Sequence, residues 1–380
     1  MTDLTLGVVG SSRKENEQRM PIHPEHLQRL PERVRRQLIF ETGYGTEFGI
    51  SDAEMAAQSG GVATRHELLA DLGVVVLPKP MLEDLEELRE EGILWGWPHC
   101  VQQTAITQAA IDRRLTLIAF EEMFEWTREG LPGLHTFYRN NEMAGYCGAL
   151  QALQLKGIDG YYGRSRKVLV FSLGAVSRGA INALMGRGFT DITICTQRPV
   201  HAVREEFLGC RYVHMRRGEE GDARMVVEDD DGTRPLLDLI GQSDIVVNGI
   251  LQNPSRPVMF VAEDEIGSLK PGCLIVDVSC DAGMGFPFAR PTTFEEPIVK
   301  VGAVDYYAVD HTPSYLWESA TRMISTPLLA YLPAVLAGRD SWAKHETLRR
   351  AVDIDRGVVT REAILSFQHR EAAYPHRREP

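Results

Sequence analysis

The stretch "VLVFSLGAVSRGAINAL", Val168–Leu184, decides the fold because it reads as a buried strand, a turn of small residues and an apolar helix. A nucleotide pyrophosphate needs a turn that bends sharply, lets the backbone approach closely and aims a helix N-terminus at the anion. Gly174 suits the close approach, and Gly179 is expected to let the helix pack against its strand. Ser172 and Ser177 stand where the usual fingerprint has glycines. The pattern alone also fits an incidental turn, but the flanking strand and helix favour a dinucleotide site.

The strand that follows indicates which dinucleotide this site takes. About 20 residues past such a turn, an NAD-binding unit offers Asp or Glu to the ribose hydroxyls. Here the strand ends in "ICTQRP", with Thr196, Gln197 and Arg198 and no acid. An acid would repel a 2′-phosphate, whereas an arginine can bind one through a charge-assisted fork. We therefore predict NADP(H) rather than NAD(H), although Arg198 could also be a solvated loop residue.

Working outward from this stretch, apolar strands alternate with helical segments along both halves of the chain. Continuous apolar strands between amphipathic helices indicate a parallel sheet covered on both faces. The predicted fold is α/β, with two doubly wound Rossmann-like domains. The strands expected in the first half are "LTLGVV", "QLIFETG", "GVVVLPKP", "GILWGWPH" and "LTLIAFEEM". Those expected in the second half are "KVLVFSL", "DITICT", "RYVHMR", "DIVVNGI", "CLIVDVSCD" and "VKVGAVDYY".

The helical tail "PSYLWESATRMISTPLLAYLPAVLAG" suggests that the first domain is discontinuous. We expect residues 1–140 and 315–380 to form a substrate domain with the catalytic residues. Residues 141–314 would form the NADP(H)-binding Rossmann domain. The active site is then expected in the cleft between the two domains.

Composition restricts the class of protein. The 380 residues are 43% hydrophobic and 25% charged, as in an ordinary globular protein, and the net charge of −12 argues against a nucleic-acid partner. No apolar run reaches the ~18 residues of a membrane span. The N-terminal "MTDLTLGVVG" lacks a secretory pattern, and the six cysteines form no regular framework. We expect a cytoplasmic protein with reduced thiols.

Two segments are expected to lie outside the packed domains. The acidic stretch "VEDDDGTRP", residues 227–235, is most simply a solvated loop. The basic, proline-containing end "QHREAAYPHRREP", residues 368–380, is expected to be mobile.

Polar side chains follow four strands of the first domain, where α/β sheets place their ligands. Arg19 comes after the first strand, Lys79 ends "VVVLPKP", His99 ends "ILWGWPHC", and Glu121 and Glu122 follow "LIAF". The two cations are suited to a carboxylate, and His99 is the natural proton donor or acceptor near neutral pH. Each residue taken singly could equally have a structural role, but four such strand ends together favour an active site.

The second domain offers a smaller set of candidates. Asp277 lies inside a strand, where it more simply orients backbone, whereas Asp281 follows the strand and could face the nicotinamide and substrate. Asn248 and Gly249 end another strand and suit contact with a cofactor ribose. His311 is more simply a connector residue. No His, Cys and Asp spacing is typical of zinc, so we predict no metal.

Together these motifs resemble the alanine dehydrogenase/pyridine nucleotide transhydrogenase superfamily over nearly the whole chain. The likeness is carried by "GVVGSSRKENEQRMPIHPEHLQRL", by the lysine before a proline, by the histidine at a strand end and by "IVDVSCDAGMGFPFARPTT". Within the superfamily, "NNEMAGYCGALQAL", "SLGAVSRGA" and "YYAVDHTPSYLWESAT" look closest to the N5-(carboxyethyl)ornithine synthases. Those enzymes condense pyruvate with the side-chain amine of ornithine or lysine and reduce the imine with NADPH.

The resemblance implies roles for particular residues. Arg19 and Lys79 would grip the carboxylate of a 2-oxo acid, His99 would be the general acid/base, and Asp281 would orient the amine. The catalytic set would thus be His99, Lys79 and Asp281. The resemblance places Asn141, Ala175, Val176, Thr196, Arg198 and Asn248 around the cofactor. The turn and strand-end residues Ser172, Gly174, Gly249 and Ile250 complete the predicted cofactor site. Relatives assemble, so a homodimer or larger homo-oligomer is expected.

Several functions remain open at this point. The first is an opine-type reductive condensation of a 2-oxo acid with an amino acid amine. The second is an amino acid dehydrogenase of the alanine dehydrogenase type, or an enzyme like saccharopine dehydrogenase. A variant of these would act on an unusual amine or hydrazine in bacterial secondary metabolism. A regulator that binds ligand without catalysis belongs to a different class.

Overall fold

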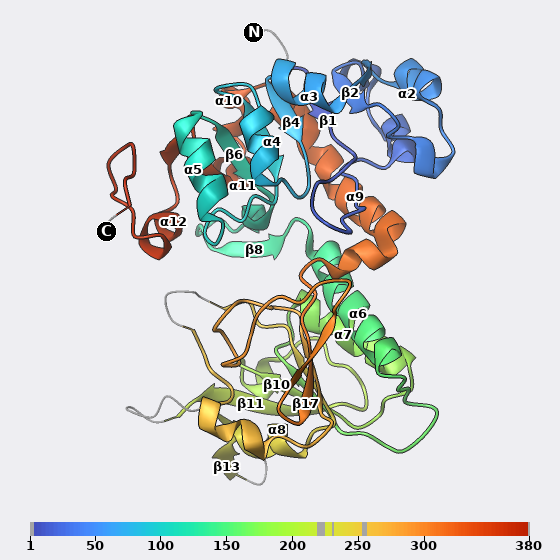
Figure 1. The fold of residues 1–380 in the computed structure, drawn as a ribbon, viewed down its shortest axis with the longest axis vertical. Coiled ribbons are helices and arrows are strands. Elements are labelled where there is room, and N and C mark those ends of the chain that lie inside the picture. The colour runs from blue at the N-terminus through green and yellow to red at the C-terminus, as the bar shows by residue number, and fades with distance from the viewer. Residues whose placement is uncertain (1–3, 219–224, 230–231, 253–256, 379–380) are drawn as a thin grey trace. The chain divides into compact units, whose positions relative to one another are not determined.

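A computed structural model describes residues 4–218, 225–229, 232–252 and 257–378, and the chain divides into two compact units (Figure 1). The first unit comprises Met1–Tyr138 and Leu316–Pro380, and the second comprises Arg139–Tyr315. Each unit is built around its own sheet.

The described part of the first unit contains an eight-stranded sheet in the order β19-β18-β6-β5-β4-β1-β2-β3. Strands β1 to β6 are mutually parallel, while β18 and β19 join the edge antiparallel. The parallel part thus has the order 3-2-1-4-5-6 of a doubly wound dinucleotide fold. The strands are β1 (Leu6–Val8), β2 (Leu38–Glu41), β3 (Gly61–Ala63), β4 (Val74–Val76), β5 (Ile93–Gly96), β6 (Thr116–Ala119), β18 (Val352–Asp355) and β19 (Val358–Val359).

Helices connect these strands, and several begin at side chains that cap them. The side chains of Ser51 and Thr64 each accept a hydrogen bond from the backbone N–H of the third helical residue. The glutamate at that position accepts one from the backbone N–H of Ser51 or Thr64, so α2 and α3 start with capping boxes. The α-helices of this unit are α1 (Glu32–Arg35), α2 (Asp52–Gln58), α3 (Arg65–Asp71), α4 (Leu82–Glu87), α5 (Thr104–Asp112), α9 (Trp317–Leu336), α10 (Arg339–Trp342), α11 (Glu346–Arg350) and α12 (Glu362–Phe367). Three 3-10 helices, η1 (Pro24–Arg29), η2 (Thr46–Phe48) and η3 (Phe120–Glu122), and a hairpin of β7 (Phe124–Trp126) and β8 (Pro132–His135) complete it.

The described part of the second unit contains a nine-stranded sheet in the order β13-β12-β11-β10-β9-β14-β15-β17-β16. Its six parallel strands again follow the order 3-2-1-4-5-6, with β9 first and β14 fourth. The strands are β9 (Val168–Phe171), β10 (Ile192–Thr196), β11 (Arg211–Arg217), β12 (Met225–Asp229), β13 (Gly232–Pro235), β14 (Ile245–Asn248), β15 (Leu274–Asp277), β16 (Ile298–Val301) and β17 (Val304–Tyr307). The helices are α6 (Tyr138–Leu155), α7 (Ala175–Gly186) and α8 (Leu236–Gln242), with 3-10 turns η4 (Val200–Ala202), η5 (Glu263–Ser268) and η6 (Thr312–Leu316).

Both sheets bury apolar side chains on both faces. In β4, Val74 and Val76 belong to one apolar cluster and Val75 to another. In β9, Leu169 and Phe171 belong to one cluster and the alternate residues to another. Because successive side chains of a strand point to opposite faces, each sheet separates two cores. This confirms the predicted α/β class with two Rossmann-like sheets.

Two predictions for the second unit were wrong. The stretch "VKVGAVDYY" is a hairpin of β16 and β17 rather than one strand, because Gly302 takes a left-handed turn with φ of +57°. The acidic stretch 227–235 is largely the hairpin of β12 and β13 rather than a solvated loop. Met225 and Val227 are buried and provide its apolar face, so their alternation outweighs the neighbouring acids. Asp230 and Asp231 lie outside the described residues.

Two predictions for the first unit were also wrong. From its sequence the stretch "HPEHLQRLPERVRRQ" is expected to form one helix. It is instead split at Pro31 into η1 and α1, because a proline removes a hydrogen bond and clashes with the preceding turn. As far as residue 378 the C-terminal end is packed rather than mobile, with Gln368, Arg370 and His376 all buried, while Glu379 and Pro380 lie outside the described residues. Their hydrogen bonds to the rest of the unit are the physical reason.

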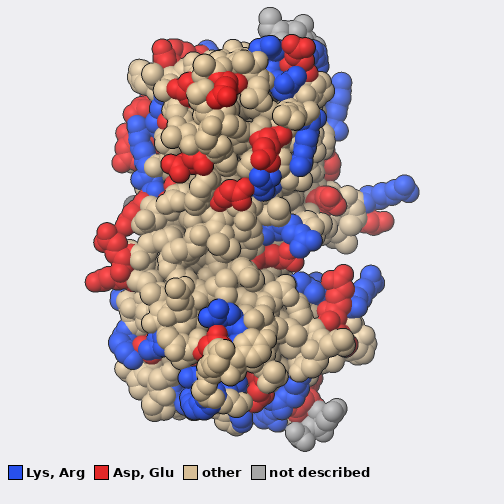
Figure 2. All heavy atoms as spheres, turned by 90° about the vertical axis from the view of Figure 1, so that its right-hand side faces the viewer, with Lys and Arg blue, Asp and Glu red and all other residues tan. Residues whose placement is uncertain are grey.

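The surface carries charges of both signs. Figure 2 shows Lys and Arg interspersed with Asp and Glu over the face drawn. Some surface charges form short-range helical pairs, such as Arg322 with Glu318 and Arg349 with Glu346. Such exposed pairs contribute little stability individually. Among the helices that the structure describes, none is long and apolar enough to cross a membrane.

Candidate functional site

Three neighbouring strands of the first unit end in residues that can carry chemistry. Lys79, His99 and Glu121 follow β4, β5 and β6, which lie side by side in parallel. Their carboxyl ends therefore meet at one edge of the sheet, where doubly wound folds bind ligands. The structure brings these three predicted residues together.

Lys79 and His99 are in direct contact, with Nζ 2.7 Å from Nε2. A lysine ammonium only donates, so Nε2 of the imidazole accepts and the ring proton is assigned to Nδ1. That nitrogen lies 3.7 Å from Oε1 of Glu121. The side chain of His99 is 39% exposed, which leaves it accessible to a small molecule. The arrangement forms a chain of cation, imidazole and carboxyl.

The carboxyl group of Glu121 fixes the backbone of His99. Its Oε1 accepts a hydrogen bond of 2.7 Å from the backbone N–H of His99, a residue held at a φ of +49°. Oε2 is buried and has no hydrogen-bond partner among the described residues. Burial, assisted by the negative charge of Asp353, raises the pKa of Glu121. A carboxyl group that retains a proton near neutral pH is suited to proton exchange with the imidazole.

A buried ion-pair network lies next to Glu121. Arg361 contacts Asp353 at 2.5 Å and Glu122 at 3.0 Å. Burial raises the pKa of Glu122 to about 7, although the charge of Arg361 opposes this. Glu122 is thus engaged by Arg361 rather than directed into the chain of Lys79 and His99. Asp353 and Arg361 were missed by sequence reasoning because they follow Glu121 by more than 230 positions and form no motif.

Arg19 is paired rather than isolated. Its guanidinium donates to both carboxylate oxygens of Glu17, at 2.8 and 2.5 Å, and lies 5.3 Å from the ring centroid of Trp97. The side chain is buried. A substrate carboxylate would therefore share Arg19 with Glu17. The sequence "ENEQR" contained this signal, since the acid stands two residues before the arginine.

The segment that carries Arg19 is tied to helix α9. The backbone N–H of Met20 donates to Thr321 Oγ1 at 3.0 Å, and His26 Nδ1 lies 2.9 Å from Ser325 Oγ. Burial, reinforced by the positive charge of Arg29, lowers the pKa of His26 from 6.5 to about 4. Between about pH 4 and pH 6.5, His26 is therefore neutral in the folded protein, whereas the same histidine is protonated in the unfolded chain.

This contact predicts an acid-dependent loss of stability. Because the unfolded state binds more protons, stability contributed by His26 is complete above about pH 6.5 and declines toward pH 4. The fall in urea midpoint between pH 7.5 and pH 5 should be smaller in His26→Gln than in the native protein. His66→Gln, at an exposed position of α3, should show the native fall. An unchanged fall in His26→Gln would contradict the prediction.

In the second unit, the turn after β9 has the features that an anion requires. Ser172 takes a φ of +75° in place of the usual glycine, at a cost of about 1 kcal/mol. Gly174 begins α7 without a side-chain cap, so the first N–H groups of the helix have no capping side chain. Ser177 is buried and donates to Phe171 O at 2.7 Å. Ala175 and Val176, also predicted at the cofactor, form the first positions of α7.

Gly179 acts differently from its predicted role. A Cβ atom at this position would lie 1.8 Å from the backbone oxygen of Glu142, which belongs to α6. Conversely, a Cβ at Gly145 in α6 would lie 1.8 Å from the backbone oxygen of Val176 in α7. The two glycines let helix α7 cross helix α6 closely. The expectation that Gly179 packs helix against strand is thus corrected to helix against helix.

The end of β10 leaves Arg198 available. Thr196 is buried and its Oγ1 accepts the backbone N–H of Arg198 at 3.1 Å. The Arg198 side chain is exposed and has no hydrogen-bond or ion-pair partner within the described ranges. An unpaired guanidinium next to a predicted ribose position can accept a phosphate.

The ends of β14 and β15 are fixed to each other. Asn248 donates to Asp277 Oδ1 at 2.9 Å and is buried, so its side chain holds the sheet edge. Asp277 also accepts the Tyr306 hydroxyl at 2.9 Å, in keeping with the orienting role expected for it. Ser279 Oγ donates to the backbone oxygen of Ile250 at 2.6 Å. Any contact of Asn248 with a cofactor stays a prediction.

Asp281 follows this edge and is available for chemistry. The carboxyl group is half-buried, has no side-chain partner among the residues described, and burial raises its pKa. Gly249 is close-packed, since a Cβ there would lie 2.4 Å from Ser177 Oγ. His311 is buried against Phe294 and contacts Asp310, as a structural residue would be. Asn141 lies in α6.

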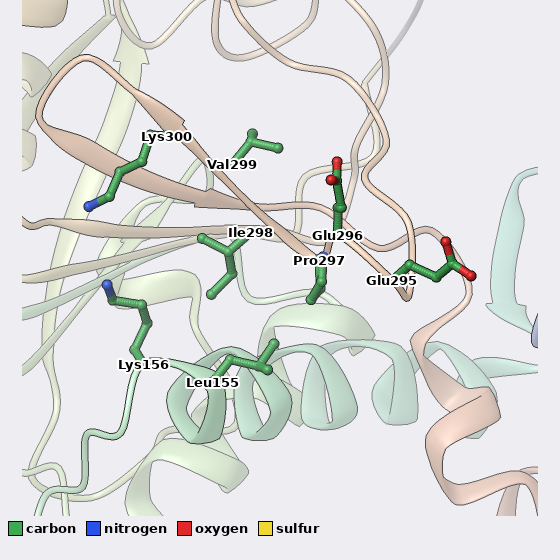
Figure 3. A pocket seen from close by; sticks show the side chains of 8 residues that line it. All are labelled: Leu155, Lys156, Glu295, Glu296, Pro297, Ile298, Val299 and Lys300. Carbon is green, nitrogen blue, oxygen red and sulfur yellow. The ribbon is translucent and has the colours of Figure 1, made fainter.

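A pocket of about 590 Å³ lies elsewhere in the second unit, beside edge strand β16. Figure 3 shows Lys156 and Lys300 directed toward each other across it. Their ammonium groups contact Asp305 at 2.6 and 2.7 Å, at the start of β17. In the described parts of the chain no cluster of His, Cys, Asp or Glu has the makings of a metal site, and the absence of a metal stays a prediction.

Comparison with known families agrees with this architecture. The alanine dehydrogenase/PNT N-terminal domain model matches residues 8–137, and the alanine dehydrogenase/PNT C-terminal domain model matches residues 151–362. The chain belongs to the alanine dehydrogenase/PNT family. It is an oxidoreductase of this family, whose members bind nicotinamide cofactors. The resemblance inferred from the sequence is thereby confirmed.

Individual relatives of this family member are distant but cover most of the chain. An N(5)-(carboxyethyl)ornithine synthase of Clostridium botulinum is 26% identical over 82% of this chain and 88% of its own. An alanine dehydrogenase of Mycobacterium tuberculosis is 27% identical over 93% and 92%. The structure of an L-alanine dehydrogenase aligns with a TM-score of 0.74 and 17% identity over 96% of this chain and 99% of that one. A transhydrogenase from Sinorhizobium meliloti aligns at 0.69 and 18%, over 94% and 99%.

Proposed function

We propose that this protein catalyses the reductive condensation of a small 2-oxo acid, such as pyruvate, with the amine of an amino acid such as ornithine or lysine, using NADPH. The observation that carries the proposal is the 2.7 Å contact between Lys79 and His99, backed by Glu121, at the carboxyl edge of the first sheet. The similarity to carboxyethylornithine synthases supports the choice of reaction. Residues 1–140 and 315–380 would then act as the substrate domain.

The residues divide the chemistry between them. Lys79 and Arg19 bind the carboxylate of the oxo acid and orient its carbonyl carbon. As the amine adds and the carbonyl oxygen leaves as water, His99 donates the proton that this oxygen needs. Asp281 orients the reacting amine. The balanced reaction consumes oxo acid, amine, NADPH and a proton, and yields a secondary amine, NADP⁺ and water.

The second unit supplies the cofactor site in this proposal, with residues 141–314 as the NADP(H)-binding domain. Bound NADPH supplies the hydride. The uncapped N-terminus of α7 suits the pyrophosphate, and the unpaired Arg198 suits the 2′-phosphate. The absence of an acid after β10 favours NADP(H) over NAD(H).

Replacing Arg198 by alanine tests the cofactor preference. Because its guanidinium would contact only the 2′-phosphate, Arg198→Ala should raise the KM for NADPH by about tenfold and leave that for NADH nearly unchanged. Steady-state rates with each cofactor measure this. Arg204→Ala, another exposed arginine of the same unit, serves as the control. A native protein that uses NADH at least as well as NADPH would contradict the assignment.

A substrate screen that follows NADPH absorbance tests the proposed reaction. Pyruvate, or a related oxo acid, is offered with ornithine, lysine, a hydrazine or ammonia. Turnover with a larger amine well above that with ammonia supports the condensation. Equal or faster turnover with ammonia would instead assign an alanine dehydrogenase activity, which the relatives in that group make the second candidate. Binding of NADPH without turnover on any pair would favour a regulator. Gel filtration of the same preparation tests the expected homo-oligomer.

A further inference from the structure

The loop that carries His99 is held on its far side by the C-terminal end of the chain. Gln368 lies just after α12 and is buried. Its Nε2 donates to Cys100 O at 2.5 Å and lies 3.2 Å from both Val101 O and Thr107 Oγ1. The two peptide oxygens belong to the residues that immediately follow His99. A single side-chain amide therefore binds the loop next to the proposed acid/base residue.

This loop needs such support because its backbone is unfavourable. A histidine with a φ of +49° is strained, and such residues persist only where their surroundings hold them. Glu121 fixes the N–H of His99 from one side. Gln103 N donates back to His99 O at 2.9 Å, and Thr107 donates to Cys100 O at 2.8 Å. Gln368 adds the contact that comes from the C-terminal segment.

Gln368 is itself held in place. Its Oε1 accepts Arg370 Nε at 2.7 Å, and Arg370 Nη1 donates to Gln108 Oε1 at 2.8 Å and to His376 O at 3.1 Å. His376 Nε2 accepts the backbone N–H of Val359 at 3.0 Å. All three side chains are buried. Both the oxygen and the nitrogen of the Gln368 amide form hydrogen bonds. The buried side chains of Gln368, Arg370 and His376 thus form a clamp on the His99 loop.

The clamp lies beyond the part of the chain that the family models match. The C-terminal model ends at residue 362, where α12 begins. The family models therefore do not cover Gln368 or Arg370.

We infer that Gln368 is a positioning residue, which sets the orientation of His99 against Lys79 and Glu121 through hydrogen bonds to the peptide oxygens of the His99 loop. This inference rests on the proposed role of His99. Small displacements of a catalytic group cost large factors in rate. The clamp acts on turnover through His99 and makes no contact with cofactor or substrate of its own.

The test uses Gln368→Met, which keeps the side-chain volume but removes the donors. With NADPH and the oxo acid and amine pair that is turned over fastest, kcat should fall about tenfold while the KM for NADPH stays unchanged. The same change made in a His99→Gln background should reduce residual turnover no further. Arg377→Ala, at an exposed position directly after His376, is the matched control and should behave as the native protein.

A spectroscopic readout separates this inference from the proposed function. In protein with labelled histidine, the resonance of the His99 ring is identified by its absence in His99→Gln. It should move in Gln368→Met and stay in place in Arg377→Ala. If His99→Gln keeps full turnover, the proposed function fails. The His99 resonance then still tests, by itself, whether Gln368 positions the His99 ring. An unmoved resonance, or equal rate losses in both backgrounds, would overturn the inference. Should Gln368→Met fail to fold, Arg370→Met, which frees Gln368 Oε1, takes its place with the same expected directions.

Discussion

The His99→Gln protein should lose turnover by about a thousandfold, because general acid/base groups contribute factors of this order. In the native protein Nε2 of the imidazole lies 2.7 Å from Lys79 Nζ and the backbone N–H of His99 is bound by Glu121. Glutamine keeps the backbone contact and a polar side chain but cannot exchange a proton near neutral pH. The measurement is the rate of NADPH oxidation with saturating oxo acid and amine.

The controls for this change separate chemistry from folding and binding. NADPH affinity, measured by cofactor fluorescence, should remain native because the cofactor residues belong to the other unit. His66→Gln, at an exposed position of α3, should retain the native rate. Retention of more than a tenth of native turnover in His99→Gln would remove His99 from the chemistry. Loss of NADPH affinity alongside turnover would point to a structural role instead.

Gly179→Ala should destabilise the second unit by about 3 kcal/mol, near the upper end of overpacking effects. Alanine usually stabilises a helix relative to glycine, by up to about 1 kcal/mol. Here, however, the added methyl group would stand 1.8 Å from the backbone oxygen of Glu142. Backbone cannot yield as a side chain does, so α7 must move away from α6. Because α7 also presents its N-terminus to the proposed pyrophosphate, NADPH affinity should fall with stability.

Chemical denaturation checks this prediction, and the same helix offers a matched control. Gly186 is the last residue of α7, is exposed, and a Cβ there would meet nothing within 4 Å. Gly186→Ala should therefore be neutral or slightly stabilising, with native NADPH affinity. Equal stability of the two variants would mean that the helices do not cross as closely as the glycines indicate.

Much of the fold could be predicted from local sequence. Runs such as "VLVF" and "VVV" are apolar at successive positions, which is typical of a strand buried on both faces. Prediction failed where a tertiary contact outweighed the local signal. The acidic stretch after Val227 looked solvated, but pairing with β11 and β13 makes it a strand. The last residues looked mobile, but Gln368 and His376 find buried partners far away in the chain.

For the site, sequence alone determined which strand ends carry ionisable groups, because polar residues that follow apolar strands must lie at the ligand-binding edge of a parallel sheet. That is why Lys79, His99 and Glu121 could be predicted together. Tertiary structure alone decided how these groups are paired and oriented. Asp353 and Arg361 lie more than 230 residues after Glu121, and Gln368 more than 260 after Cys100. Such contacts arise from the closure of long loops onto one sheet, and no local pattern encodes them because hydrogen-bond geometry exists only once the chain has folded.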